Sequence, residues 1–156
     1  FFDGPFSHLP IGATKGDILE VSFKGLPYTK EILNKGFWLL PMGNDHYKLG
    51  STYEWNNHTT TPSESARAEL LEKLQSVVDV PVEVKRHYAG LRPTCADRRP
   101  LLGEHPEQKG LYFFNGLGSK GVMMAPWCAE HLVSHIFEAA SLLPEVDVKR
   151  FEKRYK

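Results

Sequence analysis

The sequence predicts an α+β fold, in which an antiparallel sheet with one packed helix is followed by a strand, a glycine-rich turn and a second helix. Three observations point to this class. Residues 17–23 alternate apolar and polar side chains, residues 61–78 combine a helix-start signal with an amphipathic pattern, and residues 111–121 place a short apolar run ahead of three glycines. The 156 residues, of which 41% are hydrophobic, suffice for one domain or for two small lobes.

The first half of the chain carries the strand patterns. Residues 17–23 have the two-residue period of a half-buried strand, and residues 82–88 alternate in the same way. Two further runs, residues 36–41 and 46–55, flank a Gly-Asn-Asp sequence that favours a hairpin turn. Together these strands predict an antiparallel sheet.

A helix is predicted over residues 62–78. The sequence Thr61-Pro62-Ser63-Glu64 offers a capping hydroxyl at its first residue, a proline at the first helical position and a glutamate three residues after the hydroxyl. Because the apolar side chains that follow keep to one face, we expect the helix to pack on the sheet. These side chains are Ala66, Leu70, Leu74 and Val77 or Val78.

The last third of the chain differs in kind. Residues 111–114 are apolar without alternation, which is typical of a strand covered on both faces. Three glycines follow, and after Pro126 apolar residues recur at spacings of three and four, which predicts a helix that ends before Pro144. The predicted apolar face of this helix consists of Ala125, Cys128, Ala129, Leu132, Val133, Ile136, Phe137 and Ala140.

The segment Gly116-Leu117-Gly118-Ser119-Lys120-Gly121 satisfies the GxGxxG pattern between a strand and a helix. A dinucleotide-binding unit would need a second apolar strand ending in an acidic residue, but only a charged tail follows Pro144. A P-loop would need Lys and Ser or Thr where Val122 and Met123 stand. What remains is a turn whose backbone N–H groups and helix end suit an anionic ligand atom, although the glycines also suit a plain tight turn.

Arg92 is a second candidate binding residue. It precedes a proline, which favours an extended backbone, so we expect it at the end of the strand over residues 82–88. A guanidinium there can bind a carboxylate through two parallel hydrogen bonds, and a structural ion pair is the alternative.

No metal site is expected. His131 and His135 have helical spacing but lack the glutamate of a metalloprotease helix. The two cysteines, Cys95 and Cys128, have no partner at metal-ligand spacing, which favours reduced thiols over zinc or a disulfide.

Charge and hydropathy exclude several classes of protein. Nineteen Lys and Arg balance nineteen Asp and Glu without a long basic stretch, so DNA binding is not expected. No run approaches the roughly 18 apolar residues of a membrane span and no signal pattern opens the chain, so we expect a cytoplasmic protein. The chain also begins without Met, in what reads as a loop, and we expect it to be a piece of a longer protein.

Several short motifs, taken in order, resemble one family. The resemblance is to the FAD-dependent amino acid and amine oxidoreductases, such as glycine oxidase, D-amino acid oxidase or dehydrogenase and sarcosine oxidase. The motifs are Lys15-Gly16-Asp17, Leu39-Leu40-Pro41, Gly50-Ser51-Thr52, Gly90-Leu91-Arg92-Pro93-Thr94, then Asp97, Pro100, Leu102 and Gly103, the segment 116–121 and Ala125-Pro126.

The resemblance implies an organisation for the chain. Residues 1–88 would be part of a substrate-binding antiparallel domain, and residues 89–156 the C-terminal part of an FAD-binding domain. The family's N-terminal Rossmann segment, which holds the ADP half of FAD, is missing from this sequence, so we expect the isolated chain to bind FAD weakly and to be inactive. Noncovalent FAD is expected, because Gly90 stands where sarcosine oxidases attach flavin through a cysteine.

The resemblance also implies roles for particular residues. Arg92 matches the arginine that holds the substrate carboxylate, and Trp38 and Tyr53 fall where the family places pocket side chains. Lys48 lies on the strand where sarcosine oxidases carry a catalytic lysine for oxygen activation, although a solvated strand lysine is the alternative. The residues expected beside FAD are Gly90, Arg92, Gly116, Gly118, Ser119, Lys120, Gly121, Val122 and Met123.

Three functional hypotheses follow. In the first, the longer protein, alone or as a homo-oligomer, oxidises the C–N bond of a small-molecule amino acid or secondary amine to an imine. Ser119 stands where some glycine oxidases have arginine, which argues against glycine itself. In the second, the chain is a noncatalytic subunit or truncated binding module. In the third, suggested by Gly-Ser-Lys-Gly at residues 118–121, it is an FAD domain acting on the carboxymethylaminomethyl group of a tRNA wobble uridine.

Overall fold

The computed structural model describes residues 4–25, 30–55 and 57–154, which form two compact units. Residues 15–91 make up the sheet unit; residues up to 14, together with those from 92 onward, make up the glycine-turn unit. Two long strands, β1 (Ile11–Ser22) and β6 (Glu83–Cys95), contribute residues to both units. The grouping of the first residues with the C-terminal part was not predicted, and the assignment of one unit to substrate and the other to FAD stays a prediction.

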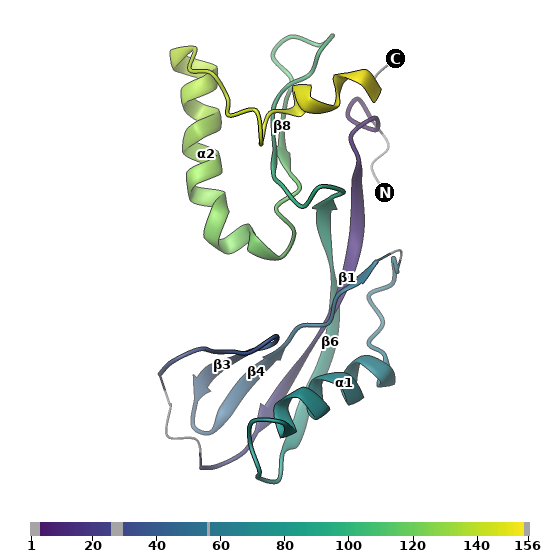
Figure 1. Ribbon diagram of the computed structural model, residues 1–156, viewed down its shortest axis with the longest axis vertical. Coiled ribbons are helices and arrows are strands. Elements are labelled where there is room, and N and C mark those ends of the chain that lie inside the picture. Colours follow the sequence, from purple (N-terminus) through teal and green to yellow (C-terminus); the bar gives the residue numbers. More distant parts are fainter. Residues whose placement is uncertain (1–3, 26–29, 56, 155–156) are drawn as a thin grey trace. The chain divides into compact units, whose positions relative to one another are not determined.

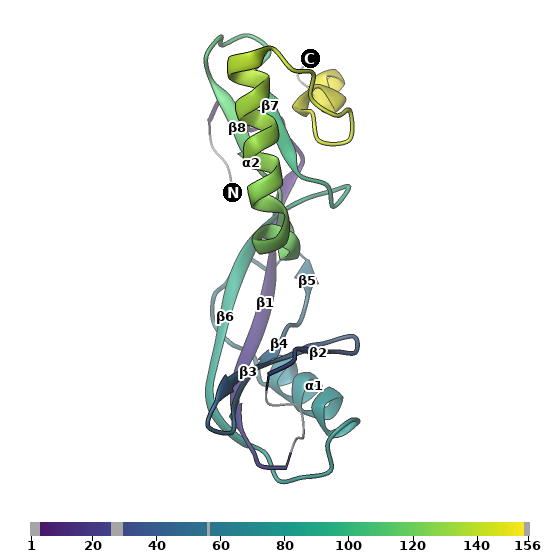
Figure 2. The same cartoon turned by 90° about the vertical axis from the view of Figure 1, so that its left-hand side faces the viewer.

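The sheet unit is built on an antiparallel sheet, which confirms the predicted α+β class (Figures 1 and 2). The strands lie in the order β2 (Leu33–Asn34), β3 (Trp38–Gly43), β4 (His46–Gly50), β1 and β5 (Glu54–Trp55), and β6 also pairs with β1. The run predicted as one strand over residues 46–55 is therefore split into β4 and β5. Strand β1 begins earlier than predicted, because its first residues lack the alternation that marks residues 17–23.

The register of the strands divides their side chains between two faces. Leu19 on β1 pairs with Leu49 on β4, which also pairs with Leu39 on β3, so the three leucines share one face. The next pair along β1 and β4, Glu20 and Lys48, lies on the opposite face. We call these the leucine face and the open face.

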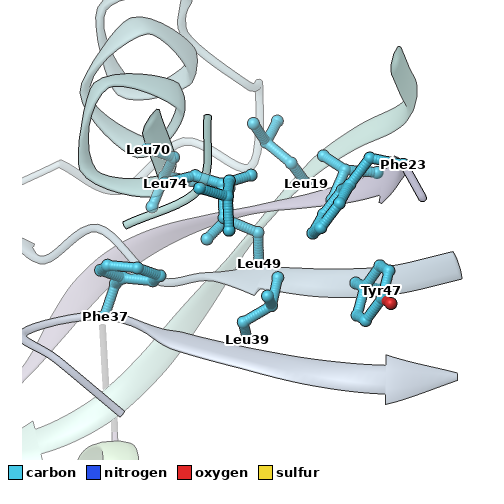
Figure 3. Close-up of a cluster of buried hydrophobic side chains, with 10 residues drawn as sticks. Leu19, Phe23, Phe37, Leu39, Tyr47, Leu49, Leu70 and Leu74 are labelled. Carbon is cyan, nitrogen blue, oxygen red and sulfur yellow. The ribbon is translucent and has the colours of Figure 1, made fainter. Parts of the chain in front are cut away.

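Helix α1 (Glu64–Gln75) covers the leucine face and completes its hydrophobic core (Figure 3). Leu70 and Leu74 are fully buried there. The core cluster consists of Leu19, Val21, Phe23, Phe37, Leu39, Tyr47, Leu49, Leu70, Leu74 and Val78. The predicted packing of the helix on the sheet is thus confirmed.

The start of α1 differs from the prediction. Ser63, not Thr61, caps the helix: its backbone is extended (φ −117°, ψ 142°) and its Oγ accepts the N–H of Ala66 at 3.3 Å. The helix also ends at Gln75, short of the predicted residue 78. The Thr-Pro pair suggested an earlier start because it fits a capping box equally well in sequence.

The glycine-turn unit contains a second, two-stranded antiparallel sheet of β7 (Leu101–Glu104) and β8 (Tyr112–Asn115). A short 3-10 helix, η1 (Gly118–Lys120), leads into α2 (Gly121–Glu138), and a second, η2 (Val148–Arg154), lies near the C-terminus (Figure 1). The apolar run predicted β8 correctly, but Phe114 is 39% exposed, so the expected burial of both faces of the strand is wrong in this unit as described.

Helix α2 begins at Gly121, ahead of Pro126, and ends in a left-handed residue, Ala139 (φ 56°), rather than at Pro144. Pro126 lies inside the helix and has no N–H, so the carbonyl of Val122 lacks its usual helical donor. Because of this missing N–H, Pro126 suggested that the helix starts after it, but the helix begins five residues earlier, at the last glycine of the turn.

The predicted apolar face of α2 is broad, and only one side of it is buried in this unit. Cys128 and Leu132 are buried in a cluster with Leu102, Leu142 and Val146. Along another side of the helix the exposed fractions are 98% for Val122, 51% for Val133 and 80% for Phe137. A second cluster in this unit consists of Leu9, Cys95, Leu101 and Val148. Both cysteines are free thiols and completely buried.

Within the described ranges, no helix combines the length and the apolar character needed to cross a bilayer. The same residues include no cluster of three or more His, Cys, Asp or Glu side chains that could hold a metal ion. His131 Nε2 instead accepts the N–H of Leu143 at 3.0 Å, and His135 Nδ1 lies 2.7 Å from the carbonyl oxygen of Ala140.

Candidate functional site

The glycine turn rests on the end of β6. Gly116 (φ 76°) and Gly118 (φ 54°) both have left-handed backbones, which other residues adopt at a cost. A Cβ placed on Gly118 would lie 3.3 Å from Thr94 Oγ1, and Leu117 forms an isolated β-bridge with Thr94. The glycines are therefore needed for both the conformation and the close approach to the strand.

The loop beneath Gly116 is fixed by a residue that the sequence did not single out. Arg150 of η2 donates to Asp97 Oδ2 at 2.9 Å and to the carbonyls of Arg99 and Pro100 at 3.2 and 3.0 Å. A Cβ on Gly116 would lie 3.5 Å from the same Arg99 carbonyl. Burial opposes ionisation of Asp97, but hydrogen bonds from Arg150, Cys95 and the N–H of Arg99, with the charge of Arg150, together outweigh it and lower the pKa of the carboxyl. Arg150 was hidden in what reads as a charged tail.

The start of α2 is accessible. Ser119 and Lys120 are exposed, as are Val122 and Met123, at 98% and 72%. In this described stretch no side chain caps the helix, and its first turn contains no acidic residue. The first N–H groups of an α-helix have no intrahelical partner and carry partial positive charge. This end of the unit therefore offers hydrogen-bond donors to an electron-rich ligand atom, with apolar side chains beside them.

Arg92 lies inside β6 and not at its end, because the strand continues to Cys95. Its carbonyl accepts the hydroxyls of Thr14 and Thr94, each at 3.4 Å. Arg92 and Thr94 are two positions apart on the strand and so share a face, and Thr94 is the residue that Gly118 approaches. Within the glycine-turn unit, the structure thus brings Arg92 and the turn to the same face of β6.

Gly90 is different from the turn glycines. It belongs to the sheet unit and is exposed, and a Cβ placed on it would meet nothing within 4 Å. Its geometry gives no reason for glycine at this position.

Trp38 and Lys48 share the open face of the sheet. Trp38 pairs with Gly50, and a Cβ on Gly50 would lie only 2.7 Å from Trp38 Cζ2, so the glycine makes room for the indole. The side chain of Lys48 is 34% exposed, and its Nζ lies 4.0 Å from Glu20 Oε1. This contact fits a solvated strand lysine, and the part of Lys48 in oxygen chemistry stays a prediction.

Tyr53 follows β4 on the loop that leads to α1. Its ring is edge-to-face with Trp55, at 5.6 Å between centroids and 76° between planes. Both side chains are exposed, at 41% and 42%. Trp55 was not predicted as a site residue, although its two-residue spacing from Tyr53 in an extended segment places both on one side.

Comparison with protein families decides the affiliation of the chain. Residues 2–135 match the sequence model of the family described as FAD dependent oxidoreductase. The chain belongs to this family. FAD is therefore the cofactor of the family, and the exposed start of α2, with no side-chain cap and no acidic side chain in its first turn, fits the electron-rich rim of a flavin.

Individual relatives of the chain agree with the family. The glycine oxidase of Pseudomonas aeruginosa is 32% identical over 122 residues, which cover 76% of this chain and 33% of that protein. The tRNA 5-methylaminomethyl-2-thiouridine biosynthesis bifunctional protein of a Caulobacter species is 40% identical over 96 residues, covering 57% of this chain and 16% of that protein. The chain spans 31% to 34% of the length of the curated glycine oxidases that it matches.

The fold of the chain is also found among solved structures. Glycine oxidase from Geobacillus kaustophilus superposes with a TM-score of 0.72 at 24% identity, over 92% of this chain and 39% of that chain. At this level of identity the likeness establishes the fold alone.

Proposed function

We propose that the full-length protein oxidises the C–N bond of an amino acid or secondary amine to an imine. The observation that carries this proposal is the position of Arg92 on the face of β6 that the glycine turn approaches, in a chain of the FAD-dependent oxidoreductase family. The names of its relatives support a substrate with a C–N bond.

Each group of residues has a distinct part in the proposal. When bound, FAD takes up the hydride that leaves the carbon beside the amine. The N–H groups at the start of α2 stabilise negative charge on the flavin rim, because they are already oriented and need no reorganisation. Arg92 binds the substrate carboxylate through its planar pair of N–H donors. Trp38 and Tyr53 line the substrate pocket, and Lys48 supplies a positive charge for oxygen activation.

The ADP half of FAD would be held by residues outside this chain. Two observations support this. The described part of the chain has the glycine turn but not the second strand of a nucleotide-binding unit, and the chain spans about a third of the length of the glycine oxidases that it matches. The isolated chain would then be inactive. Strong flavin absorbance from the purified 156-residue chain would contradict this part of the proposal.

The test uses the purified full-length protein and a substrate with a carboxylate. Arg92→Ala should raise KM by a factor that corresponds to about 2 to 5 kcal/mol, because the substrate carboxylate loses a charged, hydrogen-bonded partner. Arg86→Ala is the matched control, since Arg86 lies on the same strand but is 77% exposed and pairs only loosely with Glu20 at 3.7 Å. An unchanged KM for Arg92→Ala, or an equal effect on an amine without a carboxylate, removes Arg92 from this role.

A second candidate function is modification of a tRNA wobble uridine. It is favoured by the 40% identity to the Caulobacter bifunctional protein and by the Gly-Ser-Lys-Gly sequence in the turn. The balance of nineteen basic and nineteen acidic residues gives no electrostatic support for tRNA binding. A gel-shift assay of the full-length protein with tRNA decides, because a shift at physiological salt would favour this function over a free amine substrate.

A further inference from the structure

Both ends of one loop of the sheet unit are attached to a single residue, Asp17. The loop runs over residues 52–63, all described except residue 56, and it includes the two-residue strand β5, which pairs with β1. At its first end, the N–H of Asp17 donates to Thr52 Oγ1 at 2.8 Å, and the N–H of Thr52 donates to the Asp17 carbonyl at 3.3 Å. At its last end, the N–H of Ser63 donates to Asp17 Oδ1 at 3.0 Å. Asp17 therefore closes the loop on β1.

The carboxylate that holds the loop is itself held by the buried Lys15 and by His87. Lys15 Nζ lies 3.0 Å from Asp17 Oδ2, and both side chains are completely buried. His87 Nε2, on β6, lies 2.8 Å from Asp17 Oδ1. Burial disfavours the charged form of Asp17, but bonding from Lys15, Ser63 and His87 outweighs it and lowers the pKa of the carboxyl. Asp17 is thus held as the ionised acceptor that the loop requires.

Stability alone is a weak explanation for this pair. Burying two charges costs several kcal/mol of desolvation per ion, and an apolar pair of similar volume often serves a core equally well. The better explanation lies in what the pair fixes. Lys15 Nζ also lies 3.9 Å from Glu54 Oε1, and Glu54 Oε2 accepts from Asn57 Nδ2 at 2.8 Å. The lysine therefore adds a third attachment, inside the loop.

The attached residues alternate with the exposed aromatic residues of the loop. Thr52 is 2% exposed and Tyr53 41%; the Glu54 side chain is 36% exposed and lies 3.9 Å from Lys15, and the next residue, Trp55, is 42% exposed. In an extended segment, alternate side chains point to opposite sides. The side chain of Thr52 points inward, and the edge-to-face rings of Tyr53 and Trp55 point outward.

We propose that Lys15 and Asp17 are positioning residues that hold Tyr53 and Trp55 as a fixed aromatic surface for the apolar part of the substrate. The substrate part of this inference rests on the proposed function, in which Tyr53 lines the pocket. It narrows the substrate class to amines that carry an apolar substituent, because two rigid rings offer contact area at little entropic cost.

Hydrogen exchange of the full-length protein tests the anchoring. Asp17→Asn should speed amide exchange in residues 52–63 by about tenfold or more, with exchange in residues 18–22 and 46–50 unchanged. Glu20→Gln is the matched control, because Glu20 is a carboxylate on the same strand that contacts Lys48 and Arg86 and not the loop. Unchanged loop exchange, or an equal rise in all these strands, overturns the proposal.

A second variant guards against misfolding of Asp17→Asn. Thr52→Val removes one attachment and leaves the buried charges in place, and it should also speed exchange in the first half of the loop. If neither variant changes the loop, the proposal is wrong.

Steady-state kinetics then test the aromatic surface. For an amine with a bulky apolar substituent, Asp17→Asn and Trp55→Ala should each raise KM about tenfold and change kcat by less than about twofold, since both disturb binding and not the reacting atoms. A small amine without that substituent should show no such rise. An equal rise for both amines overturns the proposal, whereas absence of any amine oxidation by the unmodified protein, with the exchange result intact, refutes the proposed function and leaves the anchoring standing.

Discussion

The two α-helices of the described residues differ in how their first turn is capped and in how far their apolar residues are buried. Helix α1 has a side-chain cap in Ser63, a buried face against the sheet and charged residues elsewhere. Helix α2 has no side-chain cap, and its apolar face is broad. The first helix is complete within its unit. The second leaves part of its apolar face exposed within its unit.

The cores of the two units repeat this contrast. One cluster of ten described residues fills the sheet unit, whereas the glycine-turn unit has two clusters, of five and four described residues. Because a larger contiguous core buries more apolar surface, substitutions should be felt most strongly in the sheet unit.

The largest expected effect compares a buried with an exposed apolar residue. Leu74→Ala in α1 should lower the free energy of unfolding by about 2 to 5 kcal/mol, because Leu74 is fully buried and a cavity remains. Val133→Ala in α2 should change it by less than about 0.5 kcal/mol, because Val133 is half exposed. Urea unfolding of the chain measures both, and similar values for the two variants would remove the contrast between the helices.

A smaller effect compares the helix starts. Ser63→Ala should cost about 1 kcal/mol, because the N–H of Ala66 loses its acceptor. Ser119→Ala, just before α2, should leave the free energy of unfolding unchanged, because α2 has no side-chain cap to lose. A loss with Ser119→Ala as large as that with Ser63→Ala would mean that α2 is capped in solution.

The smallest effect concerns the acid sensitivity of the glycine-turn unit. The folded pKa of Asp97 is lowered, so its contribution to stability is present above its unfolded pKa and is lost as the pH falls through the folded pKa. The pair with Arg150 is partly exposed, which limits this contribution to about 1 kcal/mol or less. The free energy of unfolding, measured with urea, should therefore fall less between pH 7 and pH 3 in Asp97→Asn than in the control variant Glu152→Gln. If this fall is as large in Asp97→Asn as in the control, groups other than Asp97 cause the acid sensitivity.

Features with a local chemical cause were predictable from the sequence. Alternation found the second half of β1 and the first half of β6, the Gly-Asn-Asp turn marked the hairpin of β3 and β4, and the three glycines marked the turn before α2. The body of α1 was predicted from its apolar period, although two hydroxyl residues competed for its cap. The short strand β7 was missed, because four residues after a proline show too little of any period.

Features that depend on distant partners were not predictable. Lys15 and Asp17 look like surface residues, because the groups that allow their burial come from β6 and from the loop before α1. Arg150 was overlooked for the same reason, since its acceptors lie some fifty positions earlier in the chain. Which part of the apolar face of α2 is buried was also not predictable, because a period shows which residues align but not which of them are covered.

The distribution of sulfur has a practical consequence. Cys95 and Cys128 are the only cysteines in the sequence, and both are buried in the glycine-turn unit, where desolvation raises the pKa of each thiol. Alkylating reagents can reach these thiols only when the glycine-turn unit opens, and the sheet unit contains no cysteine that could react. The rate of thiol modification in mild denaturant therefore measures the opening of the glycine-turn unit, and no added label is needed.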